Sequence, residues 1–332
     1  MNPDLKTCLK KRDWKALKAG FHASVALRTP SGKIIRGKEE VLDALNAYPW
    51  PEFLDFERYE NIHVGYYEDH LAVKIKYKAD RINRFYMAIL DPGIRRIRLD
   101  CAYDGTLYHG FQRQKGKPTI QGSIESVLKH ITQESITITP AGRTDRGVHA
   151  HHQVIHFDTK SPLEPDRMKR LLNQMLPKDI SVLKSEHVPR LFHARFDARM
   201  KTYHYTITKD RDPFMAHYAW VKPTLDVSGL NATLALYIGE HDFSAFGKGS
   251  DSDRSTRTIL NAEAFEHNGV ITVKVESEGF LRHMVRTMVG TAVRDLEKNT
   301  HEVEKALKDP RKGHVYLAPA TGLTLHEVKY GY

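Results

Sequence analysis

Ten residues of the chain bring together the side chain types that a nucleophilic reaction needs. Residues 141–150 read Ala-Gly-Arg-Thr-Asp-Arg-Gly-Val-His-Ala, so that Asp145 stands between Arg143 and Arg146. Cations near a carboxyl group favour its ionised form, and an ionised, oriented aspartate can act as a nucleophile. Because Asp-Arg clusters also occur in ordinary turns held by a salt bridge, the pattern alone leaves both interpretations open.

The flanking sequence predicts that Asp145 lies on a loop between two strands. An alternating run at residues 135–139 leads into the segment, and an apolar run at residues 154–157 follows it. Gly142 and Gly147 permit sharp turns or a close approach of backbone to a ligand. A loop fixed by a rigid sheet is a common place for catalytic groups.

Several segments of the chain resemble one known family. Gly142-Arg143-Thr144-Asp145 followed by Gly147-Val148-His149-Ala150 is similar to the signature of the TruA family of tRNA pseudouridine synthases. Further segments that resemble this family lie at residues 103–106, 110–114, 192–196, 201–205, 239–246 and 318–323. The resemblance starts near residue 97 and runs to the end of the chain. It implies the pseudouridine synthase fold, in which two α/β halves, here about 97–205 and 203–330, share a mostly antiparallel sheet with a central cleft.

The resemblance also implies a reaction and four catalytic residues. Asp145 would be the nucleophile, and Arg286 would form a salt bridge that holds it. Tyr203 would stack on the uracil near C5, and Arg143 would help to displace the target base from its stack. The reaction rejoins the same base to the same ribose, so we expect no cofactor.

The implied substrate is tRNA, at the uridines of the anticodon stem-loop at tRNA positions 38, 39 and 40. The formal net charge of +10 and the isoelectric point of about 9.3 fit a polyanionic partner. We expect substrate-binding cations at Lys115, Lys117, Arg195 and Lys201. Members of the family are homodimers in which one tRNA contacts both subunits, so we expect a homodimer.

One residue departs from the family pattern. The family usually has a small residue after the aspartate, whereas this chain has Arg146. That residue either points to solvent, contacts tRNA phosphate or competes with Arg286 for Asp145. Together with the extra N-terminal sequence, Arg146 is the support for an alternative function, a non-catalytic tRNA-binding or remodelling protein on the same fold.

The composition restricts the other possible functions. Two cysteines, Cys8 and Cys101, are too few for a disulfide framework, and no apolar run is long enough to span a membrane. We therefore expect a cytoplasmic protein without membrane partners. His149, His151, His152 and His156 suggest a metal site, but His149 belongs to the family motif and alternate strand residues face opposite sides, so we expect none.

Residues 1–95 are expected to form a separate domain, ahead of a catalytic region at 96–332. We expect one helix with Leu9, Trp14, Leu17 and Phe21 on its apolar face and a second helix from Lys38. Strands are expected at 53–59, 62–67, 71–77 and 83–90. This order of elements resembles the NTF2-like (SnoaL-like) α+β cone fold.

The role of this first domain stays open at the level of sequence. Such folds often enclose a pocket, for which His63, Tyr66 and Tyr86 are candidates, so a small-molecule ligand that regulates the enzyme is one possibility. Dimerisation and contact with tRNA are the others. Because the boundary near residue 95 lacks a Gly-, Ser- or Pro-rich linker, we expect tight coupling, for example through strands that run on from one sheet to the other.

Overall fold

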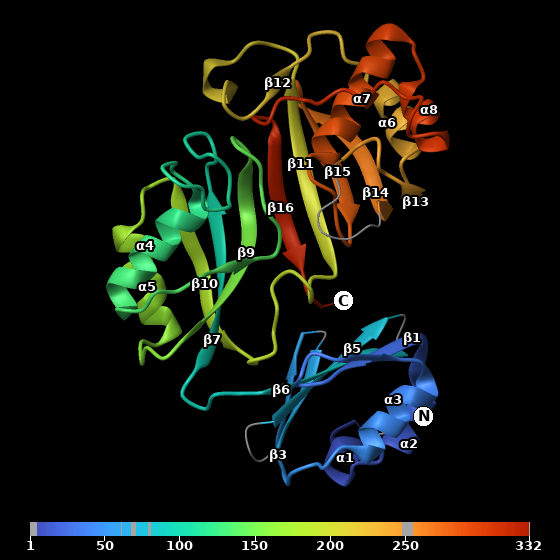
Figure 1. The fold of residues 1–332 in the computed structure, drawn as a ribbon. Helices are drawn as coiled ribbons and strands as arrows, with labels where there is room; N and C mark the ends of the chain where they lie inside the picture. Colours follow the sequence, from blue (N-terminus) through green and yellow to red (C-terminus); the bar gives the residue numbers. More distant parts are fainter. Residues whose placement is uncertain (1–4, 61, 68–70, 79–80, 248–254, 332) are drawn as a thin grey trace.

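The computed structural model describes residues 5–60, 62–67, 71–78, 81–247 and 255–331, which form two separate β-sheets with helices packed on them (Figure 1). Six strands from the N-terminal part make one sheet, and the strands that follow make a second sheet of ten strands. This arrangement confirms the expected α+β class. No helix among the described residues is long and apolar enough to cross a membrane.

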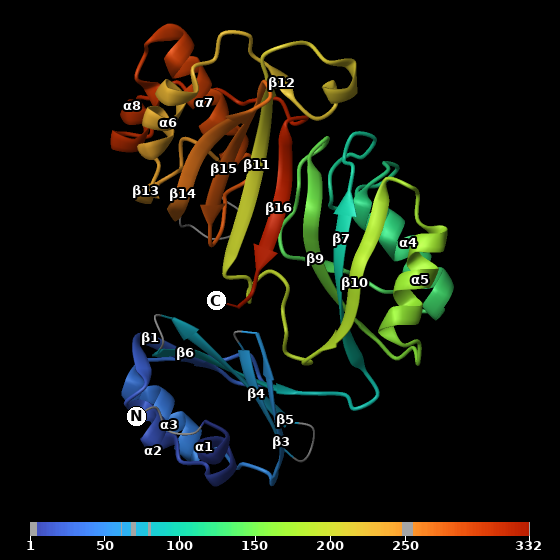
Figure 2. The ribbon, with the colours of Figure 1, turned by 180° about the vertical axis from the view of Figure 1, so that it is seen from behind.

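The N-terminal sheet has the strand order β2-β1-β6-β5-β4-β3. Its strands are β1 (Phe21–Arg28), β2 (Ile34–Arg36), β3 (Phe53–Tyr59), β4 (Ile62–Tyr67), β5 (Leu71–Lys78) and β6 (Arg81–Ile89). Helices α1 (Leu5–Lys11), α2 (Trp14–Lys18) and α3 (Lys38–Ala47) cover the face turned away from the rest of the molecule (Figures 1 and 2). Alternate strand residues such as Val25, Val73 and Phe85 pack under these helices, as the two-residue period of a strand requires.

The prediction of a single first helix was wrong. The chain forms two short helices, α1 and α2, because the side chain of Asp13 caps a new helix by accepting a hydrogen bond from the backbone NH of Ala16. Phe21 is apolar because it starts β1, where it packs against Phe85 of the neighbouring strand. Strands β1 and β2 were missed, whereas the four later strands lie where the alternation predicts them.

The larger sheet positions the candidate site. Its main path runs β10-β7-β9-β16-β11-β15-β14-β13, and all neighbours are antiparallel except β9 and β16 in the middle. The bounds of its strands are β7 (Arg95–Tyr103), β8 (Thr139–Pro140), β9 (His149–Thr159), β10 (Ile180–Val188), β11 (Met200–Thr208), β12 (Trp220–Val221), β13 (Gly239–Asp242), β14 (Thr256–His267), β15 (Val270–Ser277) and β16 (Leu323–Lys329).

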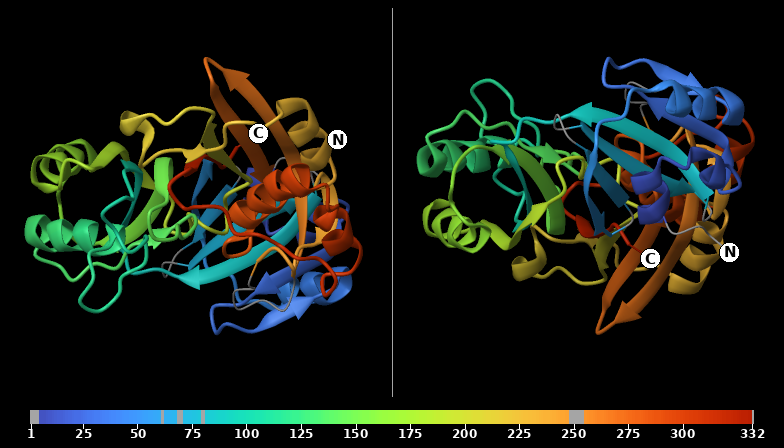
Figure 3. Two further views of the ribbon diagram at one scale, coloured as in Figure 1. Left: turned by 90° about the horizontal axis from the view of Figure 1, so that it is seen from above. Right: turned by 90° about the horizontal axis from the view of Figure 1, so that it is seen from below.

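Two groups of helices pack on this sheet, one on each side of the β9–β16 junction (Figures 1 and 3). Helices α4 (Ile120–Thr132) and α5 (Pro165–Met175) accompany the first group of strands. Helices α6 (Val227–Ala235), α7 (Met284–Lys298) and α8 (Glu302–Lys308) accompany the second, and a short 3₁₀ turn, η1, spans Pro213–Met215. The two halves therefore meet along β9 and β16, and β11 lies with the second half.

The two sheets are coupled by packing rather than by shared strands. Strand β6 ends at Ile89 in the first sheet and β7 begins at Arg95 in the second, so the expectation of strands running on was wrong. Instead Ile62, Val64 and Ala72 of the N-terminal sheet join the hydrophobic core of the large one. The view from below in Figure 3 shows the N-terminal strands lying across the large sheet.

Candidate active site

Asp145 lies on a loop, residues 141–148, that connects β8 to β9. Neighbouring backbone and side chains hold this Asp145 loop. The NH of Phe111 donates to the carbonyl of Thr144 at 3.0 Å, and the hydroxyl groups of Thr144 and Tyr103 lie 2.9 Å apart. At the start of the loop, the amide of Gln153 donates to the carbonyl of Gly142 at 2.8 Å. The loop is thus fixed from both sides. The expected strand before it was largely wrong, because residues 135–138 are not a strand and β8 contains only Thr139 and Pro140, whereas β9 follows the loop as expected.

A glycine contact explains why residues 110–114 belong to this site. Gly110 has a φ of +89°, and a β-carbon there would lie 2.8 Å from the Thr144 carbonyl oxygen. Only glycine combines that backbone conformation with so close an approach. The segment that follows brings Gln112 and Gln114 to the rim of the same cavity as Asp145.

The carboxylate of Asp145 is bracketed by two side chains from the start of α7. Arg286 Nη1 lies 3.2 Å from Asp145 Oδ2, and His283 Nε2 lies 3.5 Å from Asp145 Oδ1. The Nε of Arg286 also donates to the Ala318 carbonyl at 2.9 Å, which fixes the plane of the guanidinium group. The two partners hold the Asp145 carboxylate in place. Because 23% of its side chain stays exposed, it also remains accessible to a substrate.

These groups open into a cavity of about 870 Å³. The cavity is lined by residues 139–146, by residues 280–286 and by Tyr203 of β11. A volume of this size lies within the range of ordinary ligand sites and can enclose a nucleotide.

Tyr203 faces this cavity and packs against a second aromatic ring. Its ring meets that of Phe280 edge to face, with centroids 5.1 Å apart and an angle of 87°. Burial, followed by the electrostatic effects of Tyr103 and Asp145, raises the pKa of the Tyr203 hydroxyl further above neutral pH, where this group is already protonated. A neutral, immobilised aromatic ring in a cavity is suited to stacking on a planar base.

The predicted basic residues divide into three kinds. Arg143, Lys117 and Arg195 are exposed and line the cavity, as a role in binding an anionic substrate requires. Lys201 also lines it but is only 8% exposed, and burial lowers the pKa of Lys201 to about 8. Lys115 is exposed and is not among the residues that line the cavity.

Arg146 lines the cavity with an exposed side chain. Within the described part of the chain, the basic side chains at ion-pair distance from Asp145 are Arg286 and His283. The position that departs from the family pattern therefore adds a cation to the cavity, while Arg286 holds the aspartate.

The four histidines that suggested a metal site have different partners. His149 is buried between Asp104, the Gly105 NH and the carbonyls of His217 and Thr321. His152 pairs with Asp100, His151 lies beside His326, and burial lowers the pKa of His156 to about 2. Among the described residues, no group of three or more His, Cys, Asp or Glu side chains is arranged to hold a metal ion.

Sequence reasoning missed two residues of this site, His283 and Phe280. His283 precedes Arg286 by three positions and is the N-cap of α7, with a left-handed backbone conformation, so helical spacing does not predict that it faces Asp145. Its closeness in sequence to Arg286 was the available signal. Phe280 precedes the helix and had no periodic signal, because its role depends on the distant Tyr203.

Comparison with known sequences gives one consistent family. The sequence profile of a family described as tRNA pseudouridine synthase matches residues 101–197 and 234–331. Curated relatives include tRNA pseudouridine synthase A of a Geobacillus species, 39% identical over 71% of this chain and 98% of that protein. The Exiguobacterium protein of the same name is 40% identical over 71% of this chain and 98% of its own length.

Solved structures are similar to the N-terminal part. An NTF2-like protein of unknown function from Burkholderia xenovorans aligns with 26% of this chain and 77% of its own, at 14% identity and a TM-score of 0.22. The curated enzymes are matched over nearly their whole length, so the N-terminal sheet is an addition to the part that they share with this chain.

Proposed function

Since the chain belongs to the TruA family of tRNA pseudouridine synthases, we propose that it isomerises uridine to pseudouridine in tRNA with Asp145 as nucleophile. The bond between uracil N1 and ribose C1′ breaks, the base turns, and a bond between C5 and C1′ replaces it. The proton on C5 leaves and N1 takes one up, so atoms and electrons balance without a redox partner.

The observation that carries this proposal is the Asp145 carboxylate held by Arg286 at the edge of a cavity that also contains Tyr203. Arg286 pairs with the carboxylate at 3.2 Å and orients it, while its own guanidinium group is held by the Ala318 carbonyl. Tyr203 stacks on the uracil near C5, and Arg143 takes part in displacing the base. Flipping a base out of a helix costs a few kcal/mol, which contacts in the cavity offset.

Release of tritium tests the reaction directly. Unmodified tRNA that carries tritium at uracil C5 loses it only when a new bond forms at that carbon. We expect the wild-type protein to release tritium and the Asp145→Asn variant to release none while still binding tRNA. If the wild type binds several tRNAs tightly and releases no tritium from any of them, the protein is a tRNA-binding or remodelling protein instead.

The finer features of the substrate and assembly are part of the same proposal. We assign the modified uridines to positions 38, 39 and 40 of the anticodon stem-loop, which mapping of pseudouridine in the treated tRNA checks. We assign a homodimer, which light scattering of the purified protein checks, and a cytoplasmic location, which cell fractionation checks.

We also propose that the chain divides into an N-terminal domain at residues 1–95 and a catalytic region at 96–332. The two β-sheets and their separate helices support that division. Regulation by a small-molecule ligand of the N-terminal domain predicts that a metabolite raises the melting temperature of the full chain and changes its rate of tritium release. If a broad screen of metabolites finds no compound with both effects, the N-terminal domain does not have this regulatory role.

A further inference from the structure

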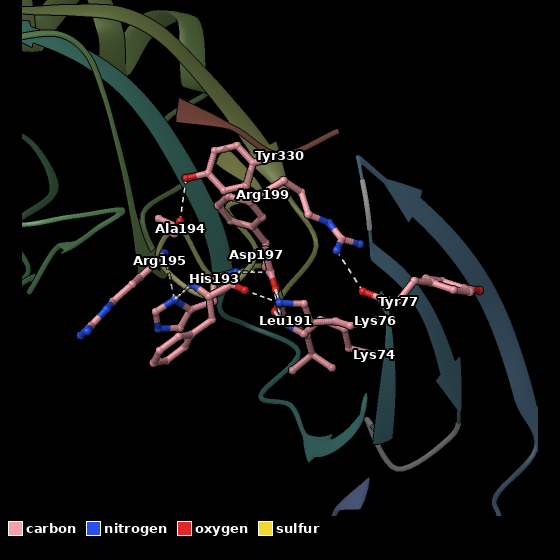
Figure 4. A network of polar contacts seen from close by, with 12 residues as sticks. Lys74, Lys76, Tyr77, Leu191, His193, Ala194, Arg195, Asp197, Arg199 and Tyr330 are labelled. Carbon is pink, nitrogen blue, oxygen red and sulfur yellow. Dashed lines mark hydrogen bonds and ion pairs between the residues drawn. The ribbon is translucent and has the colours of Figure 1, made fainter. Parts of the chain in front are cut away.

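The N-terminal sheet forms ion pairs and a hydrogen bond with one loop of the catalytic region. Residues 189–199, which we call the junction loop, connect β10 to β11 and carry Asp197. Lys74 Nζ of β5 lies 3.0 Å from Asp197 Oδ1, and Lys76 Nζ lies 3.1 Å from the same oxygen. Lys74 also donates to the Leu191 carbonyl at 2.7 Å. Figure 4 shows both lysines reaching the loop from the N-terminal strand.

This contact orients one whole face of the N-terminal sheet. Strand pairing aligns two rows of residues on the same face as the two lysines. The first row runs Arg36, Ala26, Arg84, Lys76, and the second runs Ile34, Arg28, Tyr86, Lys74. Neighbouring strands in a sheet are about 4.8 Å apart, so the rows extend from the junction loop out to the edge strand β2.

The two ends of this face differ in charge and in whether the catalytic region covers them. At the β3–β4 end, Tyr59 donates to Glu186 of β10 at 2.7 Å, and Ile62 and Val64 are fully buried. Toward the β2 edge, Arg28 and Arg36 are exposed and Arg84 is half-buried. We call these three arginines, with Tyr86, the arginine face.

Among the described residues the arginine face carries an excess of positive charge, because Asp197, which acts on Tyr86, already pairs with Lys74 and Lys76. The sequences of β1, β2, β5 and β6 contain no aspartate or glutamate at all. Among the described residues, none of the three arginines lies within ion-pair distance of a carboxylate. A sheet face with an excess of cations suits an anionic partner, since the positive charges otherwise repel one another.

The junction loop connects this face to the catalytic cavity. Arg195, two residues before Asp197, lines the cavity and points away from Lys74 and Lys76 (Figure 4). Phe196, which lies between Arg195 and Asp197 in the sequence, is 61% exposed. The guanidinium group of Arg195 lies over its ring. The loop thus lines the cavity through Arg195, and through Asp197 it contacts the two lysines that pair in register with Tyr86 and Arg84 of the arginine face.

We propose that the arginine face is a second tRNA-binding surface, which takes the sugar-phosphate backbone of a substrate whose target uridine lies in the cavity. This inference rests on the proposed function for the identity of the polyanion. Arginines recognise phosphate through paired N–H groups, and three of them along one face suit a run of backbone phosphates. The two lysines bound to Asp197 fix that face relative to Arg195.

The experiment compares tRNA binding by two double variants of the full chain. Arg28→Gln with Arg36→Gln removes two exposed charges from the arginine face. Lys10→Gln with Lys11→Gln removes two exposed charges from α1, which packs on the opposite face of the same sheet. Arg84 is left in place because it donates hydrogen bonds to the carbonyls of Ser24 and Asn83.

We expect the Arg28/Arg36 variant to bind tRNA roughly ten-fold more weakly near 0.1 M salt. The slope of log affinity against log salt concentration should become less steep by the amount that about one to two lost phosphate contacts account for. The KM for tRNA should rise with the dissociation constant. The Lys10/Lys11 variant should match the wild type in all three measurements.

Several results would overturn the inference, and they are distinct from failure of the proposed function. Equal affinities and salt slopes for the two variants would overturn it. A change of oligomeric state in the Arg28/Arg36 variant, without a change in affinity, would assign the face to a second copy of the chain. Binding needs no turnover, so these measurements remain decisive even if the wild type forms no pseudouridine.

Discussion

Two aspartates of this protein each hold basic side chains, but their surroundings are opposite. Asp145 in the catalytic region keeps 23% of its side chain exposed and pairs with Arg286 beside an open cavity. Asp197 in the junction loop is fully buried, pairs with Lys74 and Lys76, and accepts the NH of His193 at 2.7 Å. The first carboxylate can meet a substrate, and the second cannot.

The difference shows that the same pairing serves two purposes. Around Asp145 the ion pair orients a carboxylate and leaves an approach to it open, which a nucleophile requires. Around Asp197 the charges are enclosed, so removing one partner leaves the others buried without compensation. We therefore expect changes at Asp145 to affect the reaction and changes at Asp197 to affect stability.

The largest expected effect is on the catalytic side. Asp145→Asn should lower the rate of tritium release by on the order of 10⁴-fold or more, because the amide cannot replace the carboxylate as nucleophile. Urea denaturation should give a free energy of unfolding close to that of the wild type. Asp158→Asn is the control, since Asp158 forms an ion pair with Arg96 at 2.7 Å away from the cavity. Retention of activity in Asp145→Asn would remove the nucleophile assignment.

The next effect is on the junction side. Asp197→Ala should lower the free energy of unfolding of the full chain by about 3–5 kcal/mol, because it leaves two lysines at a buried site without their partner. Asp158→Ala, at a partly exposed pair, should cost less than about 1 kcal/mol. Urea denaturation of both variants measures the two values. If both variants lose a similar, small amount of unfolding free energy, the ion pairs of Asp197 do not stabilise the contact between the two sheets.

The two regions also differ in how far they could be predicted from sequence. The Asp145 loop was predictable because its residues are consecutive and flanked by strand patterns, and Arg286 and Tyr203 matched family positions. The junction was not, because Lys74 and Asp197 are 123 positions apart and no local pattern relates them. Strands β1 and β2 were missed for a related reason. The apolar spacing of Leu17 and Phe21 fits a helix, and only pairing with the distant β6 makes β1 a strand.

The pH dependence of stability gives a further test of the contact between Lys74 and Asp197. Burial lowers the pKa of Lys74 to about 8 from its usual 10.5, against the opposing effect of Asp197. Between those two values the unfolded chain binds more protons than the folded one, so the free energy of unfolding rises with pH. Relative to Lys74→Met, the wild type should gain up to about 3 kcal/mol between pH 8 and pH 10.5. A difference between the two proteins that is constant with pH would contradict this.

The smallest expected effect concerns Arg146, the residue that departs from the family pattern. Arg286 already occupies Asp145 Oδ2 at 3.2 Å and is itself held by Ala318, whereas Arg146 is exposed at the rim of the cavity. Arg146→Ala should therefore keep the rate of tritium release within about two-fold at saturating tRNA, while Arg286→Met, made in parallel, lowers it by orders of magnitude. If Arg146→Ala instead loses as much activity as Asp145→Asn, the cation that orients the nucleophile during the reaction is Arg146. The pairing of Asp145 with Arg286 would then describe only the protein without its tRNA.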